Sequence, residues 1–552
     1  MKILFEDYHY RPQDLPSLDK LTPIEMKDGS KKFPYVGYYY DNDSTKTIFI
    51  LPKVFIVNHL AFGQYKPEDL LNITTENEQL SKADQAFLFN LSAWIYQAIA
   101  LFCERHSDNE ITSERSIAGV VGHRGEGEAT LLDHILALLR FNKAHQSLFT
   151  YMATVMHSGQ HKVHWTKTIR STSPLFKSKK PYYLDCKTKE KTINYDEELI
   201  CLFYSTLDYL KQYYHFAVNR NVNYETEWPH RIANMIDSGK GTRRLRQIRG
   251  KYFIDELVQL WNLLYAFYEK AEVVAQKKTH IERLLVHNFN IVFEDMIDCL
   301  IGEFSLPSGL KEQKDGKIID HIYRDQSLVD GKEIYFIGDS KYYKDGNNIG
   351  ENSRYKQFTY AKNVIQYNID IFNGRTKGDV LRYRDELTEG YNPTPNFFIR
   401  GIVDPEDLSY HESKLQQDEG GKYYNYHFDN RLFDRDTLLV LTYDINFLYV
   451  LSAYVQSRGY SSNVDSFLRG KFRQDVLEAY QKEYDFYEIV PKDISNEEFV
   501  EGNFKKLIGK IYQTAEGKLI LALKENKASE ENKRLIDSIS TQAVLTKATL
   551  RY

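Results

Sequence analysis

The spacing of apolar positions divides the first 220 residues into a short strand-rich part and a longer helical part. Apolar and polar residues alternate near the N-terminus, with turn-forming residues between the runs, which predicts strands at 33–40 and 47–57. From residue 80, apolar positions recur at the spacing of one helix face. The predicted helical segments are 84–106, 129–157 and 195–217.

The rest of the chain begins helical and then becomes strand-rich. Ile254, Leu260 and Leu264 recur at helical spacing, so we expect helix across 253–303. From Lys317 the pattern changes to strands with tight turns, then a helix, then strands again. The expected strands are 396–403, 423–428 and 437–442, and the expected helices are 353–368, 444–457 and 464–484.

These elements predict a mixed α/β fold in three regions. Residues 1–250 form a largely helical N-terminal region with some strands. Residues 251–490 form a mixed sheet flanked by helices. Residues 491–552 are charged and show no recognisable chemistry.

Composition narrows the class of protein further. The chain has 552 residues, of which 42% are hydrophobic and 27% charged, and this excludes wholesale disorder and a fibrous protein. The formal net charge is −5, so a nucleic-acid partner requires a local basic surface. Four cysteines are scattered without a CxxC pair, which disfavours a disulfide framework and favours the cytoplasm.

One uncharged stretch requires a membrane test. Residues 85–103 contain no Asp, Glu, Lys or Arg, and their length approaches the roughly 20 residues that span a bilayer. Gln85, Asn90, Ser92 and Gln97 recur along the stretch. We therefore expect a buried helix of a large domain and no association with a membrane.

Two apolar runs near residue 320 carry the most informative polar residues. The runs at 317–325 and 332–341 read as an antiparallel hairpin, and alternation places Asp339 and Lys341 on one face. A turn centred near Leu328 and Val329 would put Asp320 across from Ile337, on that face and diagonal to Asp339. Charges directly after a buried strand need partners or a metal ion.

A third carboxylate lies upstream, because Glu294 occupies an otherwise apolar predicted helix. Glu294, Asp320 and Asp339 supply the hard oxygen ligands that Mg²⁺ prefers. Lys341 can hold a metal-activated water or stabilise developing negative charge. Each residue also has a structural interpretation: Glu294 in a salt bridge, Asp320 capping a turn, and Lys341 as an edge charge. The combination favours phosphodiester hydrolysis.

Asp320 followed by Asp339-Ser-Lys341 resembles the PD-(D/E)xK nuclease signature, with Ile319 where the proline often stands. The helix at 353–368 resembles the Tyr-Gln-x-x-x-Tyr-Ala segment that follows this motif in McrC-type restriction subunits. Gln357 and Tyr360 match that segment only after small shifts in spacing.

The neighbouring segments extend the resemblance. Phe293-Glu294 is similar to the Phe-Glu pair in the same family's preceding helix. The nearest likeness is to the LlaJI-type restriction endonucleases, which share the McrC-like core, and 165–169 is similar to a segment of those chains. The main resemblance covers residues 290–370.

This resemblance implies that 251–490 is an endonuclease domain and that 1–250 recognises the target or docks a partner. It implies Mg²⁺ bound by Asp320 and Asp339, with Glu294 assisting directly or through water. Lys341 would position the attacking water, and Gln357 would be a further site residue. The implied activity is that of a restriction endodeoxyribonuclease on double-stranded DNA, in a bacterial phage-defence system with a companion DNA methyltransferase.

A nucleotide-hydrolysing partner is also implied. McrC-like subunits work with an AAA+ GTPase of the McrB type, and no stretch of this chain fits the phosphate-loop pattern GxxxxGK[ST]. That is consistent with a two-component system.

Basic residues before the predicted nuclease region are candidate DNA-backbone contacts. A solvated surface is the ordinary alternative for such a run. The residues are Lys240, Arg243, Arg244, Arg246, Arg249 and Lys251. A second basic interval could also flank DNA, and its residues are Lys162, Lys167, Arg170, Lys177, Lys179 and Lys180.

Two other functions remain open. A RecB-like repair or phage nuclease acting with a helicase shares the same core chemistry. A DNA-binding or assembly protein with a degenerate nuclease fold would keep the fold without cutting. Discrete fragments from a plasmid indicate restriction, end-dependent degradation indicates the first alternative, and binding without cleavage indicates the second.

Overall fold

A computed structural model describes most of residues 2–550. The stretches that it does not describe are 16–22, 42–45, 72, 74–79, 107–119, 122–129, 146–149, 157–161, 194–197, 215–217, 219–225, 277–280, 304, 314–315, 345, 348, 376, 380, 426–427, 458–465 and 525–528.

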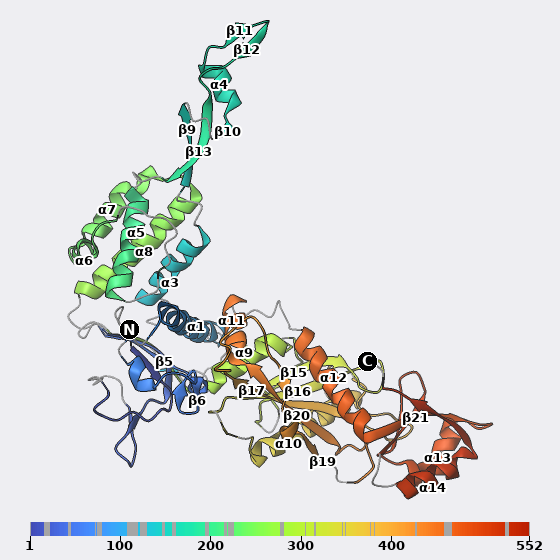
Figure 1. Ribbon diagram of the computed structural model, residues 1–552. Coiled ribbons are helices and arrows are strands. Elements are labelled where there is room, and N and C mark those ends of the chain that lie inside the picture. Colours follow the sequence, from blue (N-terminus) through green and yellow to red (C-terminus); the bar gives the residue numbers. More distant parts are fainter. Residues whose placement is uncertain are drawn as a thin grey trace.

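The chain builds four connected units and a projecting arm (Figure 1). An N-terminal sheet carries a helical bundle, and the arm extends from that bundle away from the rest of the molecule. A mixed sheet with flanking helices follows, and a smaller sheet with two helices forms the C-terminal end. The mixed α/β class expected from the sequence is confirmed.

The N-terminal sheet has the strand order β1-β5-β4-β14-β8. Its strands are β1 (Lys2–Phe5), β4 (Tyr35–Asp41), β5 (Lys46–Leu51), β8 (Val120–Val121) and β14 (Ile281–His287). Helix α1 (Lys82–His106) packs against β4, β5 and β14, and also against α9 (Asn290–Ile301) and α11 (Phe447–Gln456) of the mixed-sheet unit. Within the described residues, α1 is the one helix long and apolar enough to cross a membrane, and most of it is buried inside the protein, as predicted.

Five helices form the bundle beside this sheet. They are α3 (Leu131–Ala144), α5 (Glu198–Tyr213), α6 (Pro229–Asp237), α7 (Lys240–Ile248) and α8 (Asp255–Gln276). Thr130 caps α3 through its side chain, and the carboxylate of Glu282 on β14 accepts from the backbone N–H of Leu131 at 2.9 Å. A carboxylate at a helix N-terminus is stabilised by the helix dipole, so this contact joins sheet and bundle.

Two predicted helices are shorter than expected. The helix predicted over 129–157 ends at Ala144, and β9 (Thr150–Met156) pairs instead with β13 (Lys187–Ile193). The helix predicted over 253–303 is interrupted by β14, which pairs with β4 along seven residues. In both cases the pairing partner lies far along the chain, so local periodicity could not reveal the strand.

The third unit is a six-stranded mixed sheet, in which β15, β16, β17, β20 and β18 follow one another and β19 also pairs with β20. The strands β16, β17 and β20 run parallel, and β15 is antiparallel to β16. The strands are β15 (His321–Gln326), β16 (Glu333–Lys341), β17 (Thr394–Ile402), β18 (Gln416–Gln417), β19 (Tyr423–Asn425) and β20 (Leu438–Asn446).

Helices cover both faces of this sheet, with α12 and α10 on opposite sides (Figure 1). The ring of Phe472 on α12 stacks on Phe397 of β17 at 4.3 Å between centroids, which fixes the face that α12 covers. The helices are α9 (Asn290–Ile301), α10 (Glu351–Phe372), α11 (Phe447–Gln456) and α12 (Ser466–Glu483). This is the mixed sheet flanked by helices that the sequence predicts.

The C-terminal unit begins before the predicted boundary at 490. Strand β21 (Tyr484–Pro491) is central to a sheet ordered β22-β23-β21-β24. Its other elements are α13 (Asn496–Leu507), β22 (Ile511–Gln513), β23 (Leu519–Lys524), α14 (Ser529–Ser540) and β24 (Ala543–Ala548). The predicted boundary at 250 also differs from the packing, because α8 belongs to the bundle and β14 completes the N-terminal sheet.

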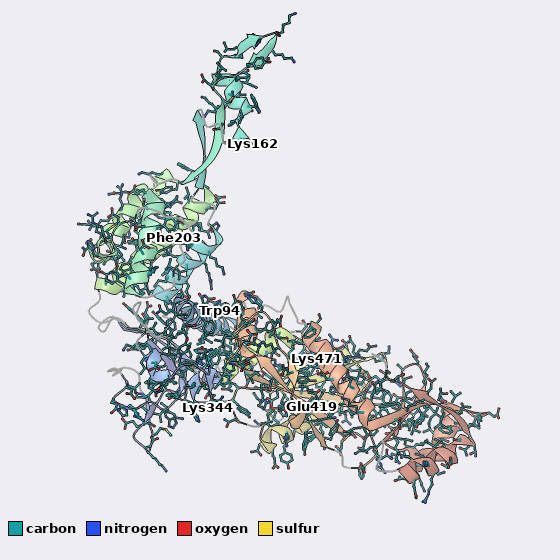
Figure 2. The ribbon with its side chains drawn as sticks, in the orientation of Figure 1. Trp94, Lys162, Phe203, Lys344, Glu419 and Lys471 are labelled. Atoms are coloured by element: carbon teal, nitrogen blue, oxygen red, sulfur yellow. The ribbon has the colours of Figure 1, made fainter. Side chains whose placement is uncertain are left out.

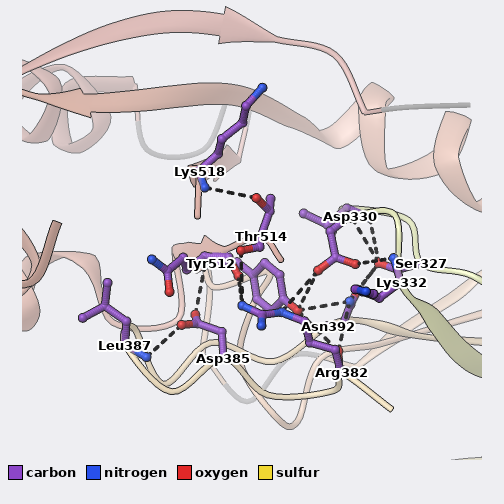
Figure 3. Close-up of polar contacts among 12 residues, drawn as sticks. Ser327, Asp330, Lys332, Arg382, Asp385, Leu387, Asn392, Tyr512, Thr514 and Lys518 are labelled. Carbon is purple, nitrogen blue, oxygen red and sulfur yellow. Dashed lines mark hydrogen bonds and ion pairs between the residues drawn. The ribbon is translucent and has the colours of Figure 1, made fainter. Parts of the chain in front are cut away.

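A buried polar cluster joins the C-terminal unit to the mixed sheet (Figure 3). Arg382 donates to the carbonyl oxygen of Gln513 at 2.8 Å. The hydroxyl of Tyr512 donates to Asp330 at 3.2 Å, and Asp385 accepts from the backbone N–H of Gln513 at 3.0 Å. Paired groups of this kind fix the orientation of two units more strictly than apolar contact does.

Candidate active site

The hairpin of β15 and β16 aligns two carboxylates. His321 pairs with Gly338 and Ile322 pairs with Ile337, so the register places Asp320 level with Asp339, just beyond the first residue of β15. The predicted register, with Asp320 across from Ile337, was therefore wrong by two residues. A shift of two residues leaves Asp320 on the predicted face of the hairpin, because side chains alternate with a period of two.

Asp339 and Lys341 project from the face of β16 opposite to that covered by α12. A Cβ added to Gly338 would lie 2.2 Å from the ring of Phe397, so the neighbouring position on the other face tolerates only glycine. Lys341 Nζ contacts Asp339 Oδ2 and lies over the ring of Phe398 at 5.5 Å. Burial lowers the pKa of Lys341, but the adjacent carboxylate of Asp339 raises it above the usual value.

Asp320 joins this pair through the backbone. The N–H of Ser340 donates to Asp320 Oδ2 at 3.1 Å, at the position directly before β15 begins. Burial, a hydrogen bond with Asp339 and the negative charges of Asp339 and Glu294 raise the pKa of Asp320 well above its usual range.

Glu294 reaches the same region from helix α9. Its Oε1 accepts from the side-chain amide of Asn290 at 3.3 Å. Burial and the charge of Asp339 raise the pKa of Glu294 to about 7, although Asn290 and Lys341 act in the opposite direction. The structure therefore brings Glu294, Asp320, Asp339 and Lys341 together, as the sequence predicts.

Gln357 is fully buried on α10. Neither its amide nitrogen nor its amide oxygen has a hydrogen-bond partner among the described residues. Tyr360, one turn further along the helix, is also buried. A buried amide without partners is costly, and it is the kind of group that a site retains for a ligand or an ordered water.

The donor set fits a hard divalent cation. Burial and mutual repulsion raise the pKa values of Glu294 and Asp320, and a positive ion between the carboxylates would offset that repulsion. Carboxylate oxygens are the ligands that Mg²⁺ prefers. In the part of the chain that the structure describes, no three His, Cys, Asp or Glu side chains are spaced as ligands of one ion.

The strand that carries the site ends against the N-terminal sheet. Tyr342 directly follows Lys341, and its ring lies beneath Lys53 Nζ at 4.9 Å. Lys344 Nζ donates to the carbonyl oxygen of Asp7 at 2.7 Å, and Figure 2 labels Lys344 at this junction. No local pattern in the sequence could indicate these contacts, because the partners are more than 280 residues apart.

Cavities lie at both ends of β16 in the mixed-sheet unit. One of 270 Å³ adjoins the ends of β16, β17 and β20 and is lined in part by Tyr343, Arg400 and Asp444. Another of 690 Å³ lies at the far end of β16, against the C-terminal unit, and is lined in part by Lys332 and Arg382. The smaller cavity begins just beyond the end of β16, at Tyr343.

Most cations of the basic run at 240–251 already contact other groups of the folded chain. Arg244 and Lys251 both contact Glu198, the second at 3.3 Å. Arg246 donates to the hydroxyl of Tyr265 at 2.9 Å, and Arg249 lies over the ring of Trp261 at 4.9 Å. Arg243 donates to the carbonyl of Ser238 at 2.9 Å. Cations held in this way are weaker candidates for phosphate contacts.

The second basic interval lies on the projecting arm, where Figure 2 labels Lys162. The arm contains β10 (Lys162–Val163), α4 (Trp165–Ser171) and the hairpin of β11 (Leu175–Lys177) and β12 (Lys180–Tyr182). Lys177, Lys179 and Lys180 are exposed and have no carboxylate partner in the described part of the chain. Ser178 and Lys179 both have positive φ, 52° and 65°, which gives a tight two-residue turn at the tip.

Sequence reasoning missed residues behind the site. His321 and Ser340 lie next to Asp320 and Asp339 in the sequence and contact each other across the hairpin at 2.5 Å. Asp298, one turn after Glu294 on α9, contacts the other side of the His321 ring. Their position next to the predicted ligands in the sequence was the one signal that could have identified His321 and Ser340.

Neither the family models, the curated proteins nor the solved structures with which the chain was compared give a match.

Proposed function

We propose that this chain is the Mg²⁺-dependent endodeoxyribonuclease subunit of a bacterial restriction system, related to the McrC-like and LlaJI-type enzymes. One observation carries the proposal. Asp320, directly before β15, lies level with Asp339 of β16 at one end of a buried sheet, with Lys341 two residues beyond and Glu294 approaching from α9. The order of these residues along the chain matches the resemblance noted above.

Each residue of the site has its own proposed role in the reaction. Asp320 and Asp339 would hold Mg²⁺, and Glu294 would assist directly or through a water molecule. Bound Mg²⁺ supplies a polarised water and neutralises charge on the phosphate. Lys341 holds its ammonium at the carboxylates, where it can orient the attacking water and stabilise negative charge that develops on the phosphate. The unpartnered amide of Gln357 would donate to the same water or ligand.

Partners follow from the same resemblance. The substrate would be double-stranded DNA, and a separate McrB-like AAA+ GTPase would drive cleavage, with a DNA methyltransferase protecting the host. The proposed location is the cytoplasm. The helical bundle and arm, which lie away from the site, are the part of the chain available for target recognition or partner docking.

The test is cleavage of supercoiled and linear plasmid DNA with Mg²⁺, with and without a McrB-like GTPase. Asp339→Asn should abolish cleavage, while Asp325→Asn, at the far end of the same hairpin, should retain it. Discrete fragments support a restriction enzyme. End-dependent degradation would instead indicate the RecB-like alternative, and DNA binding without cleavage under every condition would indicate a degenerate nuclease.

A further inference from the structure

A chain of polar contacts runs behind the candidate active site. Lys311 Nζ donates to Asp298 Oδ2 at 2.6 Å, and Asp298 Oδ1 lies 3.3 Å from His321 Nδ1. His321 Nε2 lies 2.5 Å from Ser340 Oγ. This series of contacts therefore links a loop, helix α9 and β15 to β16, the strand that carries Asp339 and Lys341.

The hydrogen bonds among Asp298, His321 and Ser340 have a defined direction. Burial raises the pKa of Asp298, but its hydrogen bond with His321 and the charge of Lys311 hold it below the usual range, so Asp298 is a carboxylate. A carboxylate beside Nδ1 requires that nitrogen to carry the proton. With its proton on Nδ1, the ring presents Nε2 as the acceptor for the hydroxyl of Ser340.

The order Asp298–His321–Ser340 is also that of a hydrolase triad, but here it lacks access to a substrate. His321 is fully buried and Ser340 is 5% exposed. Ser340 lies between Asp339 and Lys341 on β16, so its side chain projects from the opposite face of the strand. The hydroxyl therefore cannot attack a substrate held at the carboxylates.

Ser340 instead connects the two carboxylates that would bind the metal ion. Its side chain is held by His321, and its backbone N–H donates to Asp320 Oδ2 at 3.1 Å. His321 directly follows Asp320, and Ser340 directly follows Asp339. One hydrogen bond between them consequently ties together the two strand ends at the position where regular pairing of β15 stops.

We propose that His321 is a positioning residue of the candidate active site: anchored by Asp298, it holds Ser340 and thereby fixes the separation of Asp320 and Asp339. This inference rests on the proposed nuclease function, and it assigns the second layer of residues that orients the ligands of a bound ion. His321 and Ser340 do not touch the substrate.

The test uses variants that distinguish the two contacts of the ring. His321→Asn places an amide near the position of Nδ1 and keeps the contact with Asp298. His321→Gln places its amide near the position of Nε2 and keeps the contact with Ser340. Ser340→Ala removes the hydroxyl alone. Ser327→Ala is the matched control, because Ser327 is equally buried and hydrogen-bonded to Asn392 at the far end of the hairpin.

For each variant of the chain, with and without a McrB-like GTPase, we would measure single-turnover cleavage, its Mg²⁺ dependence, Ca²⁺ binding by calorimetry and thermal unfolding. We expect His321→Asn and Ser340→Ala to slow cleavage tenfold or more and to weaken Ca²⁺ binding severalfold. His321→Gln should retain most of the cleavage rate and most of the Ca²⁺ affinity. The double variant His321→Asn/Ser340→Ala should be no worse than either single variant, because contacting residues are not additive.

Several outcomes would overturn the proposal. If Ser340→Ala resembles Ser327→Ala in cleavage and Ca²⁺ binding, the hydrogen bond is merely structural. If His321→Gln is as impaired as His321→Asn, the effect does not pass through Ser340. The unsubstituted protein and Asp339→Asn serve as references. If the unsubstituted protein cuts DNA and Asp339→Asn does not, the proposed nuclease function stands. Normal activity in the His321 and Ser340 variants would then reject only the positioning role. If the unsubstituted protein neither cuts nor binds Ca²⁺, both proposals fail.

Discussion

The hydroxyl of Tyr342 donates to Glu6 Oε2 at 2.5 Å, although 336 positions separate the two residues in the sequence. Tyr342 directly follows Lys341, so this bond and the donation from the backbone N–H of Lys53 to Tyr342 fasten the end of β16, which carries the candidate site, to the N-terminal sheet. The N-terminal sheet is therefore part of the structural support of the site.

The burial of Glu6 gives the folded chain a pH-dependent stability. Burial raises the pKa of Glu6 above its usual 4.5, although the nearby Lys53 and Tyr342 act in the opposite direction. A raised carboxyl pKa contributes stability that is full below the unfolded pKa and is lost as pH rises through the folded pKa. Glu6→Gln should remove this component, so its stability relative to wild type should improve from pH 4 towards pH 8. Urea unfolding across that range tests this, and Glu25→Gln, on an exposed position, should leave the profile unchanged.

The Lys341→Ala variant distinguishes a structural role of this lysine from a role in the reaction. We expect a loss of about 1–3 kcal/mol of stability, because Asp339 loses a partly buried partner. We expect single-turnover cleavage to fall by ~10²-fold or more, as when one electrostatic stabiliser is removed. DNA affinity should stay unchanged. Lys332→Ala in the turn of the same hairpin is the control, and equal cleavage by the two variants would reject the site.

Gln357→Leu should raise stability and lower activity in the same protein. The buried amide has no partner among the described residues, so replacing it with an apolar side chain removes a penalty of about 1–3 kcal/mol. If the amide serves the reaction, cleavage should fall at least tenfold. Thermal unfolding and single-turnover cleavage decide the matter. A stabilised variant with normal cleavage would show that Gln357 is a packing residue.

The two basic surfaces should differ in their contribution to DNA binding. Lys177, Lys179 and Lys180 have no carboxylate partner in the described part of the arm, whereas Arg244 and Arg246 are already engaged by Glu198 and Tyr265. Replacing the three lysines with alanine should reduce the slope of log K against log salt by about one unit per lost phosphate contact. Replacing Arg243, Arg244 and Arg246 should reduce it less. Fluorescence anisotropy at a series of KCl concentrations measures both slopes, and equal reductions would contradict this ranking.

The sequence by itself determined the local elements that carry the site. The period-two pattern placed Asp339 and Lys341 on one face of a strand, and the structure has that strand as β16. The helical spacing at 353–368 predicted α10, with Gln357 on it. Both patterns arise from neighbours a few residues apart, which local periodicity reports directly.

The tertiary structure alone decided how these elements pair. The register of the hairpin differed from the prediction by two residues, because the paired strands and not the apolar pattern set the position of the turn. Strand β14 was hidden within a helical pattern, since its partner β4 lies some 240 residues earlier. The bonds between His321 and Ser340 and between Tyr342 and Glu6 likewise join positions whose proximity exists only after the sheets form. A one-dimensional pattern specifies which face a residue occupies, but long-range packing decides which residue it meets there.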